Sequence, residues 1–436
     1  MTALRIYAGP VARQHIEQHG LQAADVGVVP AAAGGPKGLI LGPLDRHIFG
    51  GWLTSVADPA RTVHLVGASI GAWRMATACL DQPVAAFERL EHDYIHQDFA
   101  LPPGRSRPTP QAISEQFGAN LQAFYGPRAA EVLGQRRYHL HIVTTRGRHV
   151  LGREGPWRTP LGYAGAFVTN TVHRKAMGAW LERVVFSSPQ GALPFAATDY
   201  RTRQVPLDAS NFHPALQASC SIPFVLRSVQ GIPHAPPGAY WDGGITDYHM
   251  HLPYRPDAGL VLYPHFQKAV VPGWLDKSLK WRHRPTHFLD RMVVLAPDPA
   301  WVRSLPNAKL PDRQDFTHYG RDLQARVRAW TTAVRMGQQL ADEWAAWLQR
   351  PDLIGVSERP PSAYLDRFSV DSVVFDPVAL RVLVETLGAS QVMVGSDYPY
   401  PLGERPVGSV IDRADFLDEA HKSAIRRDNA LRFLGR

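Results

Sequence analysis

The chain has 436 residues, of which 45% are apolar, and a formal net charge of +8. It contains two cysteines, no apolar run long enough to cross a membrane and no secretory signal pattern near Met1, which argues against a membrane-spanning or disulfide-dependent protein. We therefore expect a globular, cytoplasmic protein with one large α/β domain and an additional segment.

The first functional element in chain order is a predicted strand followed by a glycine-rich loop. Residues 26–30 are apolar and predict a buried strand, and residues 39–49 predict a helix. The loop between them can direct backbone N–H groups at a negatively charged oxygen, and its lysine adds positive charge. Pro36 has no N–H, so the donors must come from its neighbours. The candidate oxyanion-binding residues are Gly34, Gly35, Lys37 and Gly38.

A serine follows the next predicted strand at a sharp turn. The apolar run 63–66 leads into Gly-Ala-Ser-Ile-Gly at residues 67–71, and a helix is predicted at 70–80. This is the layout of a nucleophile elbow, with Ser69 at the start of a helix, where the helix dipole favours negative charge. Gly67 and Gly71 are expected because a side chain at either position would collide with the packed strand and helix.

The following segments alternate between strand-like and helix-like patterns. This alternation favours a mostly parallel sheet with helices on both faces, with functional residues at the carboxyl ends of the strands. Apolar residues between 323 and 348 keep a helical period and predict one long closing helix. The other predicted segments are a helix at 83–95 and strands at 138–145, 183–186, 200–205, 259–263 and 292–296.

A carboxylate beside two glycines completes a set of three motifs. Asp242 is followed directly by Gly243 and Gly244. The glycine loop, the serine turn and this Asp-Gly-Gly, in that order, resemble the patatin-like phospholipases over roughly residues 5–350. The resemblance implies an α/β fold of the patatin-like three-layer type with a mostly parallel central sheet. It also implies a dyad of Ser69 and Asp242, with the glycine loop as the oxyanion hole and with no cofactor.

The resemblance further implies a lipid acyl hydrolase or carboxylic ester hydrolase that degrades lipids. In this mechanism Asp242 takes the proton of Ser69 as the hydroxyl attacks the ester carbonyl.

The first 358 residues carry all of the positive net charge, which either favours an anionic membrane surface or aids solubility. No nucleic-acid-binding motif is present, and the sequence indicates neither the ester nor the oligomeric state. Five aromatic residues belong either to an apolar acyl channel or to the core: Trp73, Trp157, Tyr163, Phe167 and Trp180.

The last part of the chain carries a second resemblance. An apolar run at 392–394 leads into Gly-Ser-Asp-Tyr-Pro at 395–399, which resembles the carboxyl end of the amidohydrolase branch that includes aminocarboxymuconate-semialdehyde decarboxylase. In that family the corresponding aspartate binds the catalytic metal, so the resemblance implies Asp397 as a ligand. A (β/α)₈ barrel needs about 250 residues, so the tail at 359–436 is long enough for only a fragment of such a barrel. We therefore expect two parts, a hydrolase domain at 1–358 and a partial amidohydrolase-like segment at 359–436.

Two histidines offer an alternative metal site. On a strand, the side chains of His249 and His251 would point to one face and could hold a metal. Both lie within the patatin-like part, where we expect them to line or support the cleft, so the favoured interpretation includes no metal. Two alternative functions remain open. One is a metal-dependent amidohydrolase or decarboxylase-related protein that acts through the C-terminal segment, and the other is an inactive lipid-binding or scaffold protein.

Overall fold

A computed structural model describes two compact units, residues 1–351 and 352–436. The expected boundary at 358/359 lies outside the described residues. The structure describes residues 2–56, 58, 61–99, 108–349, 368–397 and 403–435.

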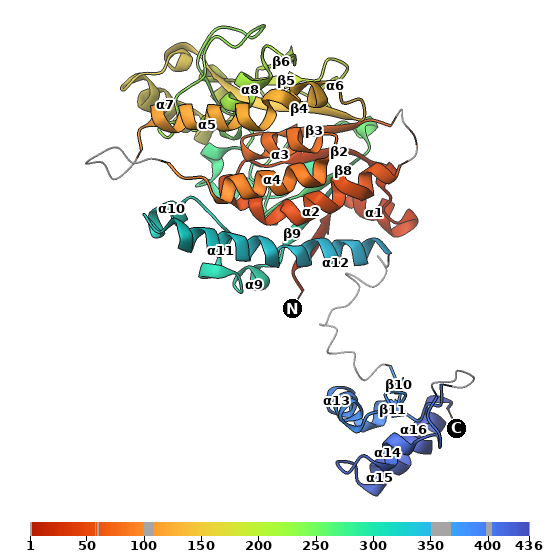
Figure 1. Ribbon diagram of the computed structural model, residues 1–436. Helices are drawn as coiled ribbons and strands as arrows, with labels where there is room; N and C mark the ends of the chain where they lie inside the picture. Colours follow the sequence, from red (N-terminus) through yellow and green to blue (C-terminus); the bar gives the residue numbers. More distant parts are fainter. Residues whose placement is uncertain are drawn as a thin grey trace. The chain divides into compact units, whose positions relative to one another are not determined.

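A nine-stranded sheet forms the centre of the N-terminal unit, with the strand order β1-β9-β8-β2-β3-β4-β5-β6 and with β7 beside β4 (Figure 1). Strands β8, β2, β3 and β4 pair in parallel, whereas β1–β9, β4–β5 and β4–β7 are antiparallel. The expected mixed α/β fold with a central sheet is thereby confirmed. The strands are β1 (Leu4–Ala8), β2 (Val26–Ala31), β3 (Val63–Gly67), β4 (Tyr138–Gly147), β5 (Leu181–Ser187), β6 (Thr202–Pro206), β7 (Tyr240–Asp242), β8 (Leu260–Pro264) and β9 (Met292–Pro297).

The most completely buried strands lie in the interior of the sheet. All six residues of β2 are buried, as are all five of β8 and all six of β9, and such uninterrupted apolar strands need cover on both faces. Figure 1 shows α2, α3 and α4 stacked beside the sheet, with α11 and α12 running along α2 and α4. The helices are α1 (Pro10–His19), α2 (Gly42–His47), α3 (Ile70–Ala78), α4 (Pro83–Ile95), α5 (Pro110–Tyr125), α6 (Ala129–Gly134), α7 (Arg158–Val172), α8 (Phe212–Cys220), α9 (Pro299–Val302), α10 (Gln314–His318), α11 (Leu323–Met336) and α12 (Gln338–Gln349).

The closing segment consists of two helices, so the prediction of one long helix at 323–348 is wrong. α11 ends at Met336 and α12 begins at Gln338, with Gly337 between them. Glycine is a weak helix former. It is needed here because an added Cβ would lie 2.8 Å from the carbonyl oxygen of Ile40, in the glycine-rich segment that follows β2. The close approach between these two segments therefore explains the glycine at the junction.

The C-terminal unit contains one parallel βαβ element. Strands β10 and β11 pair in parallel and are joined by α13, whose first N–H groups are capped by Asp376. A small apolar core around Leu380, Val392 and Ile425 lies beneath them. Its elements are β10 (Val370–Asp371), α13 (Pro377–Leu387), β11 (Val392–Met393), α14 (Ser409–Asp412), α15 (Glu419–Ser423) and α16 (Asn429–Phe433).

Among the described residues, no helix is both long enough and apolar enough to cross a membrane.

Candidate functional site

Ser69 occupies the turn between β3 and α3 in a strained backbone conformation. Its φ of 57° and ψ of −132° lie outside the regions that ordinary side chains prefer, and only 4% of the residue is exposed. The backbone N–H of Ser69 donates to the hydroxyl of Ser219 at 2.9 Å, and that hydroxyl donates to the carbonyl of Val143 at 2.7 Å. Ser219, on α8, therefore ties the turn to strand β4, a role that the sequence did not indicate.

The glycines on either side of the serine allow β3 and α3 to approach each other. A Cβ at Gly71 would lie 2.1 Å from the carbonyl oxygen of Ala31, and one at Gly67 would lie 2.5 Å from the carbonyl oxygen of Gly71. Both distances are far below a normal contact between a carbon and an oxygen. The turn can therefore form only with glycine at these two positions.

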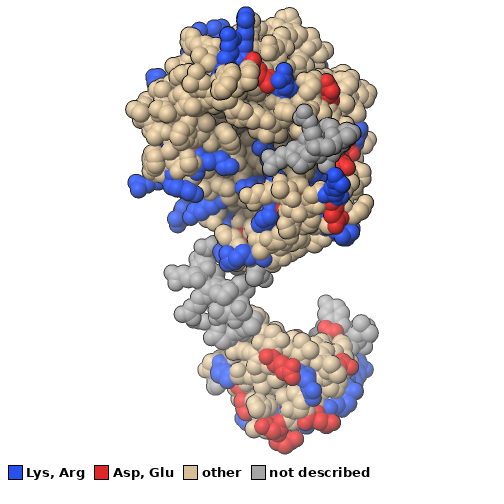
Figure 2. All heavy atoms as spheres, turned by 90° about the vertical axis from the view of Figure 1, so that its left-hand side faces the viewer, with Lys and Arg blue, Asp and Glu red and all other residues tan. Residues whose placement is uncertain are grey.

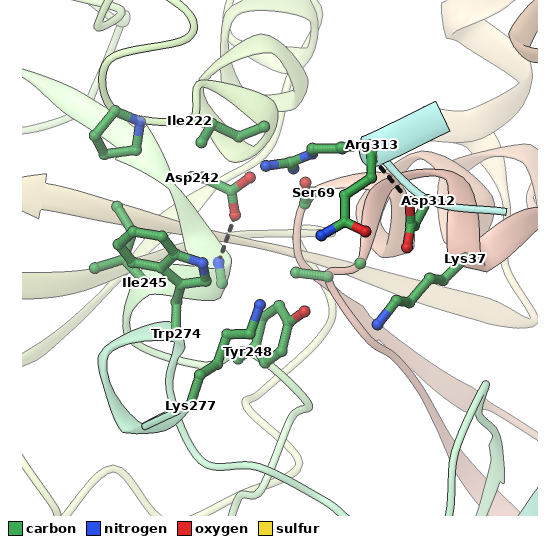
Figure 3. Close-up of a pocket in the computed structure, with 15 residues that line it drawn as sticks. Lys37, Ser69, Ile222, Asp242, Ile245, Tyr248, Trp274, Lys277, Asp312 and Arg313 are labelled. Carbon is green, nitrogen blue, oxygen red and sulfur yellow. Dashed lines mark hydrogen bonds between the residues drawn. The ribbon is translucent and has the colours of Figure 1, made fainter. Parts of the chain in front are cut away.

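Asp242, at the end of β7, lines the same pocket as Ser69 and lies close to it (Figure 3). Its carboxylate is 6% exposed and accepts a hydrogen bond from the backbone N–H of Gly244 at 2.7 Å. Burial raises the pKa of Asp242 to about 6, and hydrogen bonds from the Ser69 hydroxyl and from Gly244 together with the charge of Arg313 reduce this rise. A carboxyl group with such a pKa can exchange a proton with a bound hydroxyl near neutral pH.

The glycine loop contributes to the same pocket only in part. The cavity of about 250 Å³ is lined by Gly34 and Lys37, whereas Gly35 and Gly38 do not line it. Gly35 has a φ of +57°, and a Cβ there would lie 3.2 Å from the guanidinium Nε of Arg313. The structure thus brings Ser69, Asp242, Gly34 and Lys37 together. The oxyanion-hole role of the loop stays a prediction.

Sequence reasoning missed several residues of this pocket. Arg313 and Lys277 come from loops far along the chain that carry no motif, so only the tertiary structure reveals them. The five aromatic residues considered for an acyl channel do not line the described pocket, and Trp157 and Phe167 are exposed on or beside α7. The aromatic side chains at the pocket are Tyr248 and Trp274.

His249 and His251 lie in a loop rather than on a strand, so the geometric argument for a shared metal does not hold. Met250 between them has a φ of 50°. The Nδ1 atom of His249 accepts from the backbone N–H of Val271 at 3.0 Å, and His251 Nε2 lies 2.9 Å from the Thr286 hydroxyl. Burial lowers the pKa of both histidines. Across the described residues, no group of three histidine, cysteine or acidic side chains is arranged to hold a metal ion.

Asp397 lies in the C-terminal unit, four residues after β11. It is half-buried and has a φ of 55°, and the preceding glycine Gly395 donates its N–H to the hydroxyl of Ser372 at 3.3 Å. Part of the predicted motif, residues 398–402, lies outside the described residues. The aspartate is thus positioned just beyond the carboxyl end of a parallel strand, where βα-type folds carry functional groups.

Comparisons with known proteins match the C-terminal end of the chain. A family model described as Amidohydrolase matches residues 308–436. A 2-amino-3-carboxymuconate-6-semialdehyde decarboxylase of Dictyostelium discoideum is 42% identical over 87 residues, which cover 20% of this chain and 24% of that protein. One of Caenorhabditis elegans is 35% identical over 89 residues, which cover 20% and 22%. The chain therefore spans about a quarter of the length of these relatives.

These matches confirm the predicted amidohydrolase resemblance of the C-terminal segment. They also correct the functional expectation. A serine-dependent lipid acyl hydrolase with a phospholipase-like role is wrong as the main interpretation, because the family match and both relatives point to amidohydrolase or decarboxylase chemistry. Neither comparison supports the patatin-like resemblance of the first part.

Proposed function

We propose that the chain is an enzyme of the amidohydrolase and decarboxylase class and that its C-terminal unit contributes Asp397 to the catalytic centre. The observation that carries this proposal is the Amidohydrolase match over residues 308–436, together with the identity of the chain to two decarboxylases over 87 and 89 residues. The position of Asp397 after the second strand of a parallel βαβ element supports it.

The described residues of the C-terminal unit do not make a metal centre by themselves. A catalytic metal of this kind needs about three protein ligands, and no cluster of three suitable side chains exists among the described residues. Further ligands would have to come from outside this described set. The proposal therefore covers the class of reaction and the role of Asp397.

The test is an assay of the full chain with the substrate of its relatives, 2-amino-3-carboxymuconate-6-semialdehyde, in which loss of the carboxylate is measured. We expect turnover by the unchanged protein and loss of turnover in Asp397→Asn, because the amide removes the negative charge but keeps the shape. Asp415→Asn is the matched control, since Asp415 is an exposed acid of the same unit. Absence of turnover in the unchanged protein, or equal activity of the Asp397 variant, would contradict the proposal.

A separate proposal concerns the N-terminal unit, where Ser69 and Asp242 would act as a catalytic pair. It is supported by the strained backbone of Ser69 and by the raised pKa of the buried Asp242 carboxyl. We assign no substrate to this pair. The two proposals are independent, because one rests on the comparisons and the other on the geometry of the pocket.

The pair can be tested by the pH dependence of covalent labelling with diisopropyl fluorophosphate. We expect labelling at Ser69 whose rate rises with pH around an apparent pKa near 6, as the Asp242 carboxyl loses its proton. Ser69→Ala should abolish the labelling and Asp242→Asn should slow it, whereas Ser210→Ala, which alters an exposed serine, should change nothing. Labelling that is equally fast in Asp242→Asn would refute the role of the carboxylate.

A further inference from the structure

Three positively charged side chains surround the pocket of Ser69. Lys37 comes from the glycine loop, Lys277 from the loop after β8, and Arg313 from the segment before α10. Figure 3 shows Arg313 extending toward Ser69 and Asp242, with Lys37 and Lys277 directed inward from the opposite side of the pocket. Figure 2 shows that basic side chains outnumber acidic ones on one face of the N-terminal unit.

None of these three cations forms an ion pair within the described part of the chain. The Nζ of Lys37 lies 5.6 Å from the ring centre of Phe266, and the Nζ of Lys277 lies 5.3 Å from that of Tyr248. The Arg313 guanidinium lies beside Gly35, where an added Cβ would be 3.2 Å from its Nε. Aromatic rings therefore hold the two lysines without neutralising their charge.

The acidic groups at the pocket do not balance these charges. Asp312 is held by Lys309 at 2.7 Å. Asp242 is the other acid of the lining; its pKa of about 6 leaves it mostly ionised at neutral pH, so the lining holds two carboxylates, one of them paired with Lys309, against three cations.

The three cations also influence one another. Burial lowers the pKa of Lys277, and the positive charges of Lys37 and Arg313 lower it further. Burial likewise lowers the pKa of Lys37. Like charges held together in a cavity create a positive potential that an anionic ligand would relieve.

The geometry points to the Ser69 pocket as a recognition site for a small anionic ligand, whose carboxylate or phosphate oxygens are bound by Arg313, Lys277 and Lys37. The cavity of about 250 Å³ is slightly smaller than the roughly 300–1,000 Å³ of pockets for drug-sized ligands, which favours a compact molecule. Arg313 offers a planar fork that matches two such oxygens, and the lysines act as point charges. This inference goes beyond the proposed decarboxylase class and does not depend on it.

The test is a titration of the full chain with inorganic phosphate and with succinate, followed by calorimetry and by tryptophan fluorescence, because Trp274 lines the pocket. We expect saturable binding of at least one of these anions that weakens with added salt. Arg313→Gln and Lys277→Gln should each weaken binding about tenfold, which corresponds to about 1.4 kcal/mol. Asp312→Asn should strengthen it, because it removes a negative charge from the lining.

Matched controls separate the pocket from the general positive charge of the protein. Lys175 and Arg303 are exposed basic residues outside the pocket lining, so Lys175→Gln and Arg303→Gln should bind as the unchanged protein does. Vesicles that contain phosphatidylglycerol form a second arm. If the pocket variants weaken vesicle binding as well, the anionic group can be carried by a lipid headgroup, and if they do not, the ligand is a free anion. The inference is overturned if neither anion binds, or if the control variants weaken binding as much as the pocket variants do.

Discussion

Replacing Asp242 by asparagine should stabilise the N-terminal unit at neutral pH, even though the residue lies at the candidate site. The pKa of the buried carboxyl is about 6, against an ordinary value of 3.8. At about 1.36 kcal/mol per pKa unit, the difference makes the ionised carboxylate cost about 3 kcal/mol of folding free energy. Asparagine has no such charge, and its amide oxygen can still accept the hydrogen bond from Gly244.

The sign of the pH dependence follows from the raised pKa. Because the folded state holds the proton more tightly than the unfolded state, the cost is present in full above about pH 6. It is relieved as the pH falls from about 6 toward 3.8. The Asn variant should therefore exceed the unchanged protein in unfolding free energy by about 3 kcal/mol at pH 8 and by almost nothing near pH 4.

Urea unfolding between pH 4 and pH 8, followed by tryptophan fluorescence, measures this difference. All 11 tryptophans lie before residue 352, so the signal reports the N-terminal unit alone. Asp93→Asn, which alters a half-exposed acid on α4, should show no comparable pH-dependent gain. A difference at Asp242 that does not vary with pH, or an Asn variant that is less stable at every pH, would refute the argument that burial controls this carboxyl.

Two further predictions concern the support of the serine turn. Asp45→Asn should lower the free energy of unfolding by about 3–5 kcal/mol in the same urea experiment. The carboxylate of Asp45 accepts two hydrogen bonds of 2.7 Å from the guanidinium of Arg74, which would be left buried without its partner. A loss below about 1 kcal/mol would show that the pair is dispensable. Gly71→Ala should destabilise the N-terminal unit by at least about 1–3 kcal/mol, because the added methyl group would lie 2.1 Å from a backbone oxygen of β2. Gly51→Ala is the control and should be tolerated, because its added methyl group meets nothing within 4 Å. Equal stability of the two variants would contradict this packing.

The local motifs could be predicted because their geometry is set by neighbouring residues. A strand, two glycines and a helix within ten residues place Ser69 at a turn without reference to the remainder of the fold. The pocket cations could not be predicted in this way. Arg313 and Lys277 line the same pocket as Ser69 only because segments more than 200 residues away along the chain fold back to it. No local sequence pattern predicts such a contact.

Two local patterns in the sequence did not match the backbone. A helical period of apolar residues continued across Gly337, but the close approach of Ile40 requires a glycine there, and α11 ends beside it. The alternation of His249 and His251 suggested a strand, whereas the backbone between them turns through a positive φ at Met250.

The role of Asp397 in the reaction and the binding of anions at the Ser69 pocket can be tested separately, because their residues belong to different compact units. Asp397 lies in residues 352–436, which contain no tryptophan, whereas Ser69, Asp242 and all the tryptophans lie in residues 1–351. If Asp397→Asn abolishes turnover while anion binding followed by tryptophan fluorescence is unchanged, the reaction belongs to the C-terminal unit and the pocket has a separate role. If Arg313→Gln lowers turnover as well as anion affinity, the pocket takes part in the reaction. Assigning the chemistry to Asp397 alone would then be wrong.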